Sequence, residues 1–469
     1  MRHAVVLRKV VGPTVGVLAW LFIQVAPVPA QLDLASPLVL QSPNAQVGFG
    51  FGLAGGDING DGYDDVIVGS VLSSVGDLKN AGRVFVFFGG SAPDGTPDLV
   101  LQSPQPEAEA RFGWSIAVGD INGDGYGDIV VSALLAQGGA RSGRGAAYVF
   151  FGGPTPDAQA DVTLARPADL NANARYGWAL TTGDLNGDGL DEIVVGGQNV
   201  EVLGTEGAGQ VFVYFGSRSF RGTLGMTLIS PRVERAGEFG NALISADFNG
   251  DGYDDVAVAA TGQSVGNAAN AGQVFLFFGS PAFDATSDLA LQQSSPTRTA
   301  RFGFALAAGD INGDGFKDVI VGVTKPPRNP LGRTNQGEVH VFPGGEQMSA
   351  TAAFVCSQPS VDGFGSALAS GDVNRDQRDD VIVGVPTPNL RANSPGRALI
   401  FFGGVSLDCA ADLTLESPEP ASGDQFGSII ATGDVNGDGR LDVIIGAPHP
   451  PSILGGGGAP GRAFVYFGR

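Results

Sequence analysis

The amino-acid sequence predicts an all-β fold, a seven-bladed β-propeller of four-stranded antiparallel blades that is closed by the N-terminal strand. Three observations predict it. An acidic, glycine-rich motif recurs seven times, four strand-like segments accompany each copy, and the fourth segment missing after the last copy is found near the N-terminus. Repeats that each hold four short strands are typical of propeller blades, and seven blades lie within the usual range of about four to eight.

The repeats keep a nearly constant period. In the second repeat, residues 112–118, 128–131, 146–151 and 162–164 are rich in β-branched and aromatic side chains, and Gly, Asp, Asn and Pro separate them. Such runs indicate four short strands joined by tight turns. Neighbouring copies of the motif are 62 to 64 residues apart, and their opening aspartates are Asp57, Asp120, Asp184, Asp247, Asp310, Asp372 and Asp434.

The two ends of the repeat array predict that the ring closes. The last repeat stops after its third strand, whereas residues 38–43 have the same sequence, Leu-Val-Leu-Gln-Ser-Pro, as residues 99–104 in a fourth strand. We therefore expect the N-terminal strand to complete the seventh blade. An open solenoid of stacked sheets is the alternative, and it explains neither observation. The seven fourth strands are expected to begin at Leu38, Leu99, Val162, Met226, Leu289, Phe354 and Leu413.

Residues 1–30 have the features of a secretory signal peptide. The basic residues Arg2, Arg8 and Lys9 precede an apolar stretch at 15–23, and Val-Pro-Ala at 28–30 resembles a cleavage site. A retained membrane anchor is the alternative, but the apolar stretch is shorter than the roughly 20 residues that span a bilayer. We expect a single domain over residues 31–469 that is secreted or extracellular, at the cell surface or in the periplasm, without a membrane span after cleavage.

The charge and the cysteine content limit the function classes. Cleavage after residue 30 leaves 24 Lys and Arg against 48 Asp and Glu, which disfavours nucleic acid as a partner and favours bound cations. Cys356 and Cys409 are the only cysteines, so a disulfide framework and a cysteine-rich metal site are excluded. One disulfide between them and two unpaired thiols both remain open at this point.

The recurring motif predicts a calcium-binding hairpin loop. In residues 57–65, side-chain oxygens stand at positions 1, 3, 5 and 9, position 7 offers its carbonyl, and glycines at positions 4 and 6 permit a tight wrap. This all-oxygen set suits Ca²⁺, and a β-strand follows where an EF-hand would have its exiting helix. The candidate ligands of up to seven ions are Asp57, Asn59, Asp61, Tyr63, Asp65; Asp120, Asn122, Asp124, Tyr126, Asp128; Asp184, Asn186, Asp188, Leu190, Glu192; Asp247, Asn249, Asp251, Tyr253, Asp255; Asp310, Asn312, Asp314, Phe316, Asp318; Asp372, Asn374, Asp376, Arg378, Asp380; and Asp434, Asn436, Asp438, Arg440, Asp442.

Ordinary Asn-Gly and Asp-Gly turns are the alternative interpretation of these loops. A turn of that kind needs no acid at position 9, yet all seven loops have one, and this favours metal binding. The sites need not be equal. The sixth loop lacks both glycines and contains Arg375 and Arg378, so we expect it to be the weakest or empty, and the third loop uses the longer Glu192.

The repeats resemble FG-GAP repeats, the blades of the integrin α-chain N-terminal propeller. The resemblance rests on the calcium loop, on a Gly-Ala-Pro after the second strand that is complete only at 446–448, and on Phe-Gly before the first strand, as in Phe112-Gly113, Phe302-Gly303, Phe364-Gly365 and Phe426-Gly427. It implies calcium loops on one face and variable loops, such as 71–81, 134–144, 325–336 and 448–460, on the other. The stalk and inserted domains of an integrin subunit are not found, so no heterodimeric receptor is implied.

A binding module is the function that we expect. The resemblance implies an adhesion or ligand-binding propeller with mainly structural calcium and an extracellular protein or glycan ligand on the face opposite the calcium loops, and we expect a monomer. A carbohydrate-binding, lectin-like propeller is the alternative, although Trp114 and Trp178 are expected to pack in the core. A propeller associated with a phospholipase-like hydrolase is a third interpretation. His340 and His449 are the only histidines after residue 30 and no Gly-x-Ser-x-Gly elbow is present, so we expect no enzyme.

Overall fold

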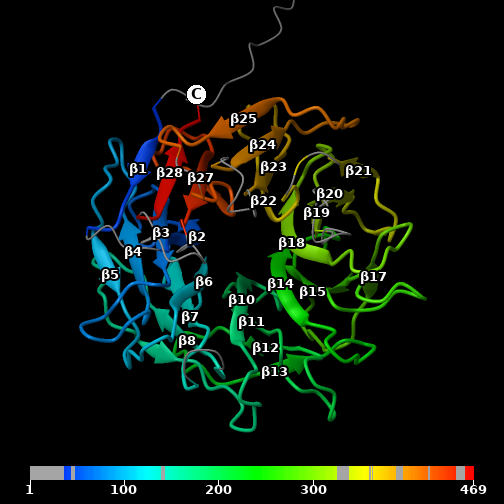
Figure 1. The fold of residues 1–469 in the computed structure, drawn as a ribbon, viewed down its shortest axis with the longest axis horizontal. Helices are drawn as coiled ribbons and strands as arrows, with labels where there is room; N and C mark the ends of the chain where they lie inside the picture. Colours follow the sequence, from blue (N-terminus) through cyan, green and yellow to red (C-terminus); the bar gives the residue numbers. More distant parts are fainter. Residues whose placement is uncertain are drawn as a thin grey trace, which may run out of the picture.

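A computed structural model describes residues 36–43, 48–138, 143–324, 337–358, 361, 363–386, 395–420, 423–449 and 460–468. The predicted signal peptide, the variable loop at 325–336 and most of the loop at 448–460 lie outside these ranges. Across the described residues, 28 β-strands form seven four-stranded antiparallel sheets arranged around one axis (Figure 1). The predicted all-β propeller is confirmed.

Each sheet is one blade, and its first strand lies next to the axis (Figure 1). The first strands of blades 1 to 7 are β2 (Phe49–Gly56), β6 (Phe112–Gly119), β10 (Tyr176–Gly183), β14 (Phe239–Ala246), β18 (Phe302–Gly309), β22 (Ala367–Gly371) and β26 (Ile429–Gly433). The second strands are β3 (Asp65–Ser70), β7 (Asp128–Ala133), β11 (Glu192–Gly197), β15 (Asp255–Ala260), β19 (Asp318–Thr324), β23 (Asp380–Val385) and β27 (Asp442–Ala447).

The third and fourth strands lie progressively farther from the axis. The third strands are β4 (Arg83–Phe87), β8 (Ala146–Phe150), β12 (Gln210–Tyr214), β16 (Gln273–Phe277), β20 (Gly337–Phe342), β24 (Arg397–Phe401) and β28 (Arg462–Tyr466). The fourth strands of blades 1 to 6 are β5 (Leu99–Leu101), β9 (Val162–Thr163), β13 (Met226–Leu228), β17 (Leu289–Leu291), β21 (Phe354–Ser357) and β25 (Leu413–Glu416).

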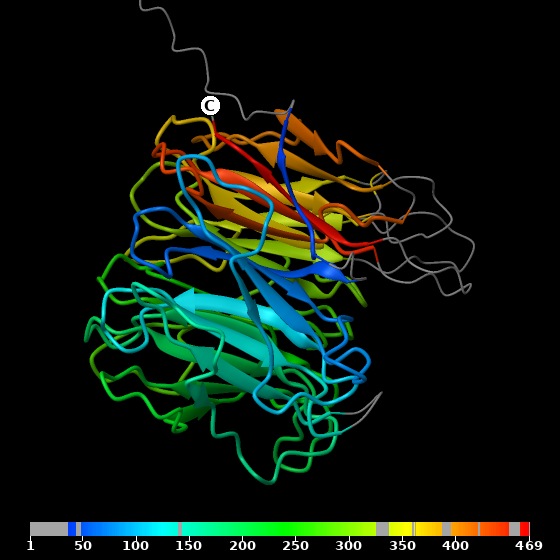
Figure 2. The ribbon, with the colours of Figure 1, turned by 90° about the vertical axis from the view of Figure 1, so that its left-hand side faces the viewer.

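The seventh blade is completed by the N-terminal strand β1 (Leu38–Leu40). In this blade the strand order is β1-β28-β27-β26, and Leu38, Val39 and Leu40 lie opposite Val465, Phe464 and Ala463. Strand β1 (blue) runs alongside β28 (red) in Figure 1 and in the perpendicular view of Figure 2. The predicted closure is confirmed, and it gives the outer edge of β28 a hydrogen-bonding partner.

The hydrophobic core lies between neighbouring blades. The cluster at the closure seam shows this, since Leu40 and Val465 of blade 7 pack with Val66 and Phe85 of blade 1. Second strands are buried on both faces, which explains their continuous β-branched sequences. Between blades the backbones approach so closely that a Cβ added to Gly145 would lie 1.9 Å from the carbonyl oxygen of Tyr176. A contact this close leaves room only for glycine at that position.

A disulfide joins Cys356 of β21 in blade 5 to Cys409, which lies between β24 and β25 of blade 6. Of the two alternatives that the sequence left open, the structure has the disulfide. The described residues form strands, turns and bends, and no helix among them is long and apolar enough to cross a membrane.

Candidate metal loops and ligand-binding face

Each predicted calcium loop joins the first strand of a blade to the second. In the first loop, Asp57 accepts hydrogen bonds from the N–H groups of Gly60 and Gly62 at 2.6 and 2.9 Å, and Asn59 accepts one from Asp61 at 2.9 Å. Gly60 and Gly62 have φ values of +76° and +86°, which glycine adopts readily. The side-chain oxygens of Asp57 and Asn59 are therefore directed at backbone N–H groups of their own loop.

The position-9 acid has a role that the sequence did not reveal. Asp65 is buried, and its carboxylate accepts the N–H of Ile58 at 3.0 Å and that of Gly89 at 2.8 Å. Asp65 thus links the loop to the end of the third strand. An acid at position 9 therefore has a structural role that does not require a metal ion. Burial raises the pKa of Asp65 to about 7, and that of the equivalent Glu192 to about 8. A nearby cation would favour the ionised form.

The donor chemistry of the loops fits calcium, since carboxylate, amide and carbonyl oxygens are the ligands that this ion prefers. Over the described ranges, no group of three or more His, Cys, Asp or Glu side chains converges closely enough to hold a metal ion. Instead, the oxygens at positions 1, 3 and 5 face N–H groups of their own loop, as Asp61 does with Tyr63 at 3.0 Å. The ligand assignment of the seven loops remains a prediction.

The sixth loop keeps the shape of the others without their glycines. Arg375 and Gln377 at positions 4 and 6 have φ values of +64° and +69°, a conformation that costs non-glycine residues about 1–2 kcal/mol each. Asp372 still accepts the N–H of Gln377 at 2.9 Å. The Arg375 guanidinium donates to the carbonyl oxygens of Asp438 and Gly439 in the seventh loop at 3.2 and 3.0 Å. This guanidinium places a positive charge beside both loops, and the weak or absent metal binding of the sixth loop stays a prediction.

Neighbouring loops are also linked by position 8. Asp64 of the first loop accepts the N–H of Asp434, the opening residue of the seventh loop, at 2.8 Å, and donates its own N–H to the Asp434 carbonyl at 3.0 Å. The double-acid sequence Asp-Asp at positions 8 and 9 was the signal for this contact. Equivalent carboxylate bonds join Asp191 to Asp120, Asp254 to Asp184 and Asp379 to Asp310.

The described cavities lie on the opposite face, where the loops from strand 2 to 3 and from strand 4 to 1 meet. One of them, the axial cavity, has a volume of about 390 Å³ and includes Phe51, Trp114, Trp178, Asn241 and Phe304 in its lining. The expectation that Trp114 and Trp178 pack in the core is wrong. Both are partly exposed, because the third residue of each first strand faces the axis and not a neighbouring blade.

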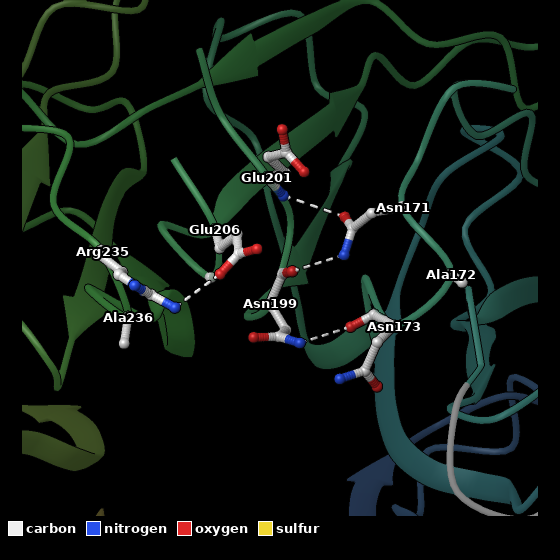
Figure 3. A pocket seen from close by; sticks show the side chains of 9 residues that line it. Asn171, Ala172, Asn173, Asn199, Glu201, Glu206, Arg235 and Ala236 are labelled. Carbon is white, nitrogen blue, oxygen red and sulfur yellow. Dashed lines mark hydrogen bonds and ion pairs between the residues drawn. The ribbon is translucent and has the colours of Figure 1, made fainter. Parts of the chain in front are cut away.

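Two further cavities lie on this face, around blades 3 to 5. The larger, of about 500 Å³, is built from Asn171, Asn173, Asn199, Glu201, Glu206 and Arg235, among others (Figure 3). Asn171 accepts the N–H of Glu201 at 3.0 Å, and Arg235 pairs with Glu206 at 2.8 Å. The smaller, of about 240 Å³, shares Ala236 with it and shares Arg301 with the axial cavity.

The rim of this face has strained backbone at one repeated position. The residue directly before Phe-Gly or Tyr-Gly has a positive φ of 53° to 57° in five blades. Such conformations cost energy and cluster at ligand-binding sites. The five residues are Arg111, Arg175, Glu238, Arg301 and Gln425.

Comparison with known proteins agrees with this architecture. The FG-GAP repeat pattern matches seven segments, residues 49–87, 112–150, 176–214, 239–277, 302–342, 364–401 and 426–466. The chain belongs to the FG-GAP repeat family. In blades 1 to 5 each FG-GAP match runs from the first strand through the candidate metal loop to the end of the third strand.

Two kinds of curated protein share this FG-GAP region. The phosphatidylinositol-glycan-specific phospholipases D of Rattus norvegicus and Homo sapiens are 26% identical over 393 and 398 residues, which is 76% and 77% of this chain and 46% of each relative. Integrin alpha-PS5 of Drosophila melanogaster is 32% identical over 162 residues, 33% of this chain and 15% of the integrin. The chain thus spans less than half the length of these relatives.

The two histidines of the described FG-GAP blades are bonded to carboxylates. His340 of β20 packs against Phe302 with its ring centroid 5.5 Å away and lies 3.1 Å from a Glu338 oxygen. His449 lies 2.8 Å from a carboxylate oxygen of Asp424. His340 is buried in the blade, and neither contact is an arrangement of nucleophile and base.

Proposed function

We propose that this chain is a secreted, calcium-binding propeller that acts as an adhesion or ligand-binding module. Its ligand, an extracellular protein or glycan, binds the face opposite the metal loops. The observation that carries the proposal is the difference between the two faces. The loops on one face bond to one another from blade to blade, whereas the three described cavities and the strained rim lie on the other.

Calcium in this proposal stabilises the ring. Asp57, Asn59, Asp61 and Asp65 would hold an ion in the first loop together with the carbonyl of Tyr63, and the ion would offset repulsion among carboxylates. We expect dissociation constants on the order of 10⁻⁴ to 10⁻³ M, as in extracellular modules. Chelation with EDTA should lower the melting temperature and re-addition of Ca²⁺ should restore it, because an ion that binds only the folded state stabilises it. A melting curve that EDTA leaves unmoved would falsify the structural role of calcium.

Binding without catalysis is the second part of the proposal. The relatives named as phospholipases D are covered by this chain over only 46% of their length, so that activity is not transferred to it. The pairing of His340 and His449 with carboxylates supports a structural role for both. The test is incubation of the purified protein with glycosylphosphatidylinositol-anchored and ester substrates, with and without Ca²⁺. If the protein releases product and the Asp65→Asn variant does not, the assignment as a binding module without catalysis is overturned.

The ligand face is tested with surface variants. The protein, labelled and loaded with Ca²⁺, is applied to a glycan array and to extracellular proteins in a pull-down. Glu206→Lys changes the cavity face, and Asp61→Asn changes the loop face. We expect Glu206→Lys, on the cavity face, to weaken ligand capture. EDTA should weaken capture only to the extent that it unfolds the protein. Loss of capture in Asp61→Asn at an unchanged melting temperature would place the ligand on the metal loops instead.

Secretion and the monomeric state have direct tests. Expression of the full chain in a secreting host should release a product whose N-terminal sequence begins near Gln31, and light scattering should give the mass of one chain. A product that stays in the membrane fraction with residues 1–30 intact would support the membrane-anchor alternative.

A further inference from the structure

The axial cavity has a composition of its own. Its lining comes from the first strands of blades 1 to 5 and from the seventh blade around Gln425 and Ser428. Of the residues that the structure describes, no Asp or Glu lines this cavity, and its charged residue is Arg301, which pairs with Glu238 at 2.8 Å. A positively charged ligand would therefore meet no carboxylate in the described lining.

An arc of aromatic rings forms one wall of the axial cavity. The ring centroid of Trp114 lies 4.7 Å from that of Phe51 and 5.1 Å from that of Trp178, and its indole N–H donates to the Trp178 carbonyl at 3.2 Å. The guanidinium of Arg301 lies 5.6 Å from the ring of Phe304, which is 36% exposed. These contacts fix the rings before a ligand arrives, which lowers the entropy cost of binding.

A hydrogen-bond donor is held ready beside the aromatic arc. Asn241 occupies the same repeat position as Trp114 and Trp178 but is only 8% exposed. Its carbonyl oxygen accepts a hydrogen bond from Gln198 at 2.9 Å, which orients the amide. Asn241 lines the cavity, and its NH₂ group donates no hydrogen bond to any described residue. A ligand that displaces water from this donor without accepting its hydrogen bond would leave it unpaired at a cost, so a ligand with an acceptor oxygen is favoured.

We propose that the axial cavity binds a saccharide, with the apolar C–H groups of the sugar against the Trp114, Trp178 and Phe304 rings that line the cavity and its hydroxyl groups on Asn241 and Ser428. This inference rests on the proposed ligand-binding function and names the ligand class. A pyranose has an apolar C–H face and a rim of hydroxyls, and the cavity has both matching surfaces. A phenylalanine or tryptophan side chain would fill the space but has no acceptor for the Asn241 donor. The volume of about 390 Å³ lies within the range of small-ligand sites.

Tryptophan fluorescence reports directly on this site. Trp114 and Trp178 line the cavity, and the third tryptophan of the chain, Trp20, lies in the predicted signal peptide. The secreted protein is titrated with the oligosaccharide that binds best on a glycan array, and the emission spectrum and acrylamide quenching are followed. We expect a saturable shift of the emission and protection of both indoles from acrylamide.

Two variants and one control place the sugar. Phe304→Ala and Asn241→Leu should each weaken binding about tenfold, since one removes an aromatic face and the other the free donor. Arg235→Gln changes the separate 500 Å³ cavity and should leave the affinity unchanged. Melting temperatures close to that of the unchanged protein establish that the variants are folded. If Asn241→Leu disturbs folding through Gln198, the less buried Phe304→Ala variant decides.

Other outcomes separate this inference from the proposed function. If Arg235→Gln abolishes sugar binding and Phe304→Ala does not, only the assignment of the sugar to the axial cavity is overturned. Capture of a protein ligand without any bound oligosaccharide overturns the saccharide class and leaves the ligand-binding function standing. A tight complex of an arginine-rich peptide that shifts the tryptophan emission overturns the charge argument. Absence of both sugar and protein ligands refutes the proposed function itself.

Discussion

Replacement of Leu40 by alanine tests whether the ring is closed in solution. Leu40 is fully buried in β1, and it packs at the seam with blade 1 while lying opposite Ala463 of β28. A buried leucine replaced by alanine typically costs about 2–5 kcal/mol through lost transfer free energy and the cavity left behind. At about 2.1 cal/mol/K per residue, a ring of this length has an unfolding entropy of about 0.9 kcal/mol/K. The variant should therefore melt about 2–5 °C lower.

Leu101→Ala is the matched control. Leu101 is equally buried and lies opposite Val84 in the fourth strand of blade 1, which is continuous in sequence with the rest of its blade. Both variants are melted by calorimetry at one Ca²⁺ concentration. If β1 completes the seventh blade, the two melting temperatures fall by similar amounts. A normal melting temperature for Leu40→Ala beside a lowered one for Leu101→Ala would show that the ring is open at this seam.

Two further predictions concern the loops and the disulfide. Gly60→Ala should destabilise the protein more than Gly62→Ala. Both glycines have positive φ, but only at Gly60 would an added Cβ collide with a neighbour, the Tyr126 ring at 2.4 Å. Equal melting temperatures of the two variants would contradict that contact. Loss of the bond between Cys356 and Cys409, which are 53 residues apart, should lower the free energy of unfolding by about 4 kcal/mol by the chain-entropy estimate. Serine at both positions should reproduce the effect of reduction, and a protein indifferent to dithiothreitol would argue against the bond.

The position-9 acid shows how a repeated residue can have more than one physical cause. Repetition in all seven loops indicated a ligand, and the structure adds a pair of backbone hydrogen bonds to each of these carboxylates, as at Asp65. Substitution by asparagine, as in Asp65→Asn, would weaken both roles. Calcium affinity measured beside stability in EDTA separates them, because the structural role persists without the ion.

The sequence by itself determined the fold. The period of the motif set the number of blades, and the match of residues 38–43 to residues 99–104 set the closure, since each blade needs a fourth strand to cover its outer edge. It also located the loops, because turn chemistry depends on residues that are close together along the chain.

Only the tertiary structure decided which surfaces these repeats present. The sequence shows that Trp114 and Trp178 occupy the same position of two repeats. Whether that position is exposed depends on how the seven first strands pack around one axis. The bonds from Asp64 to Asp434 and from Cys356 to Cys409 likewise join different blades. A repeat pattern describes one blade at a time, whereas the axial cavity and the links between loops exist only once neighbouring blades are stacked.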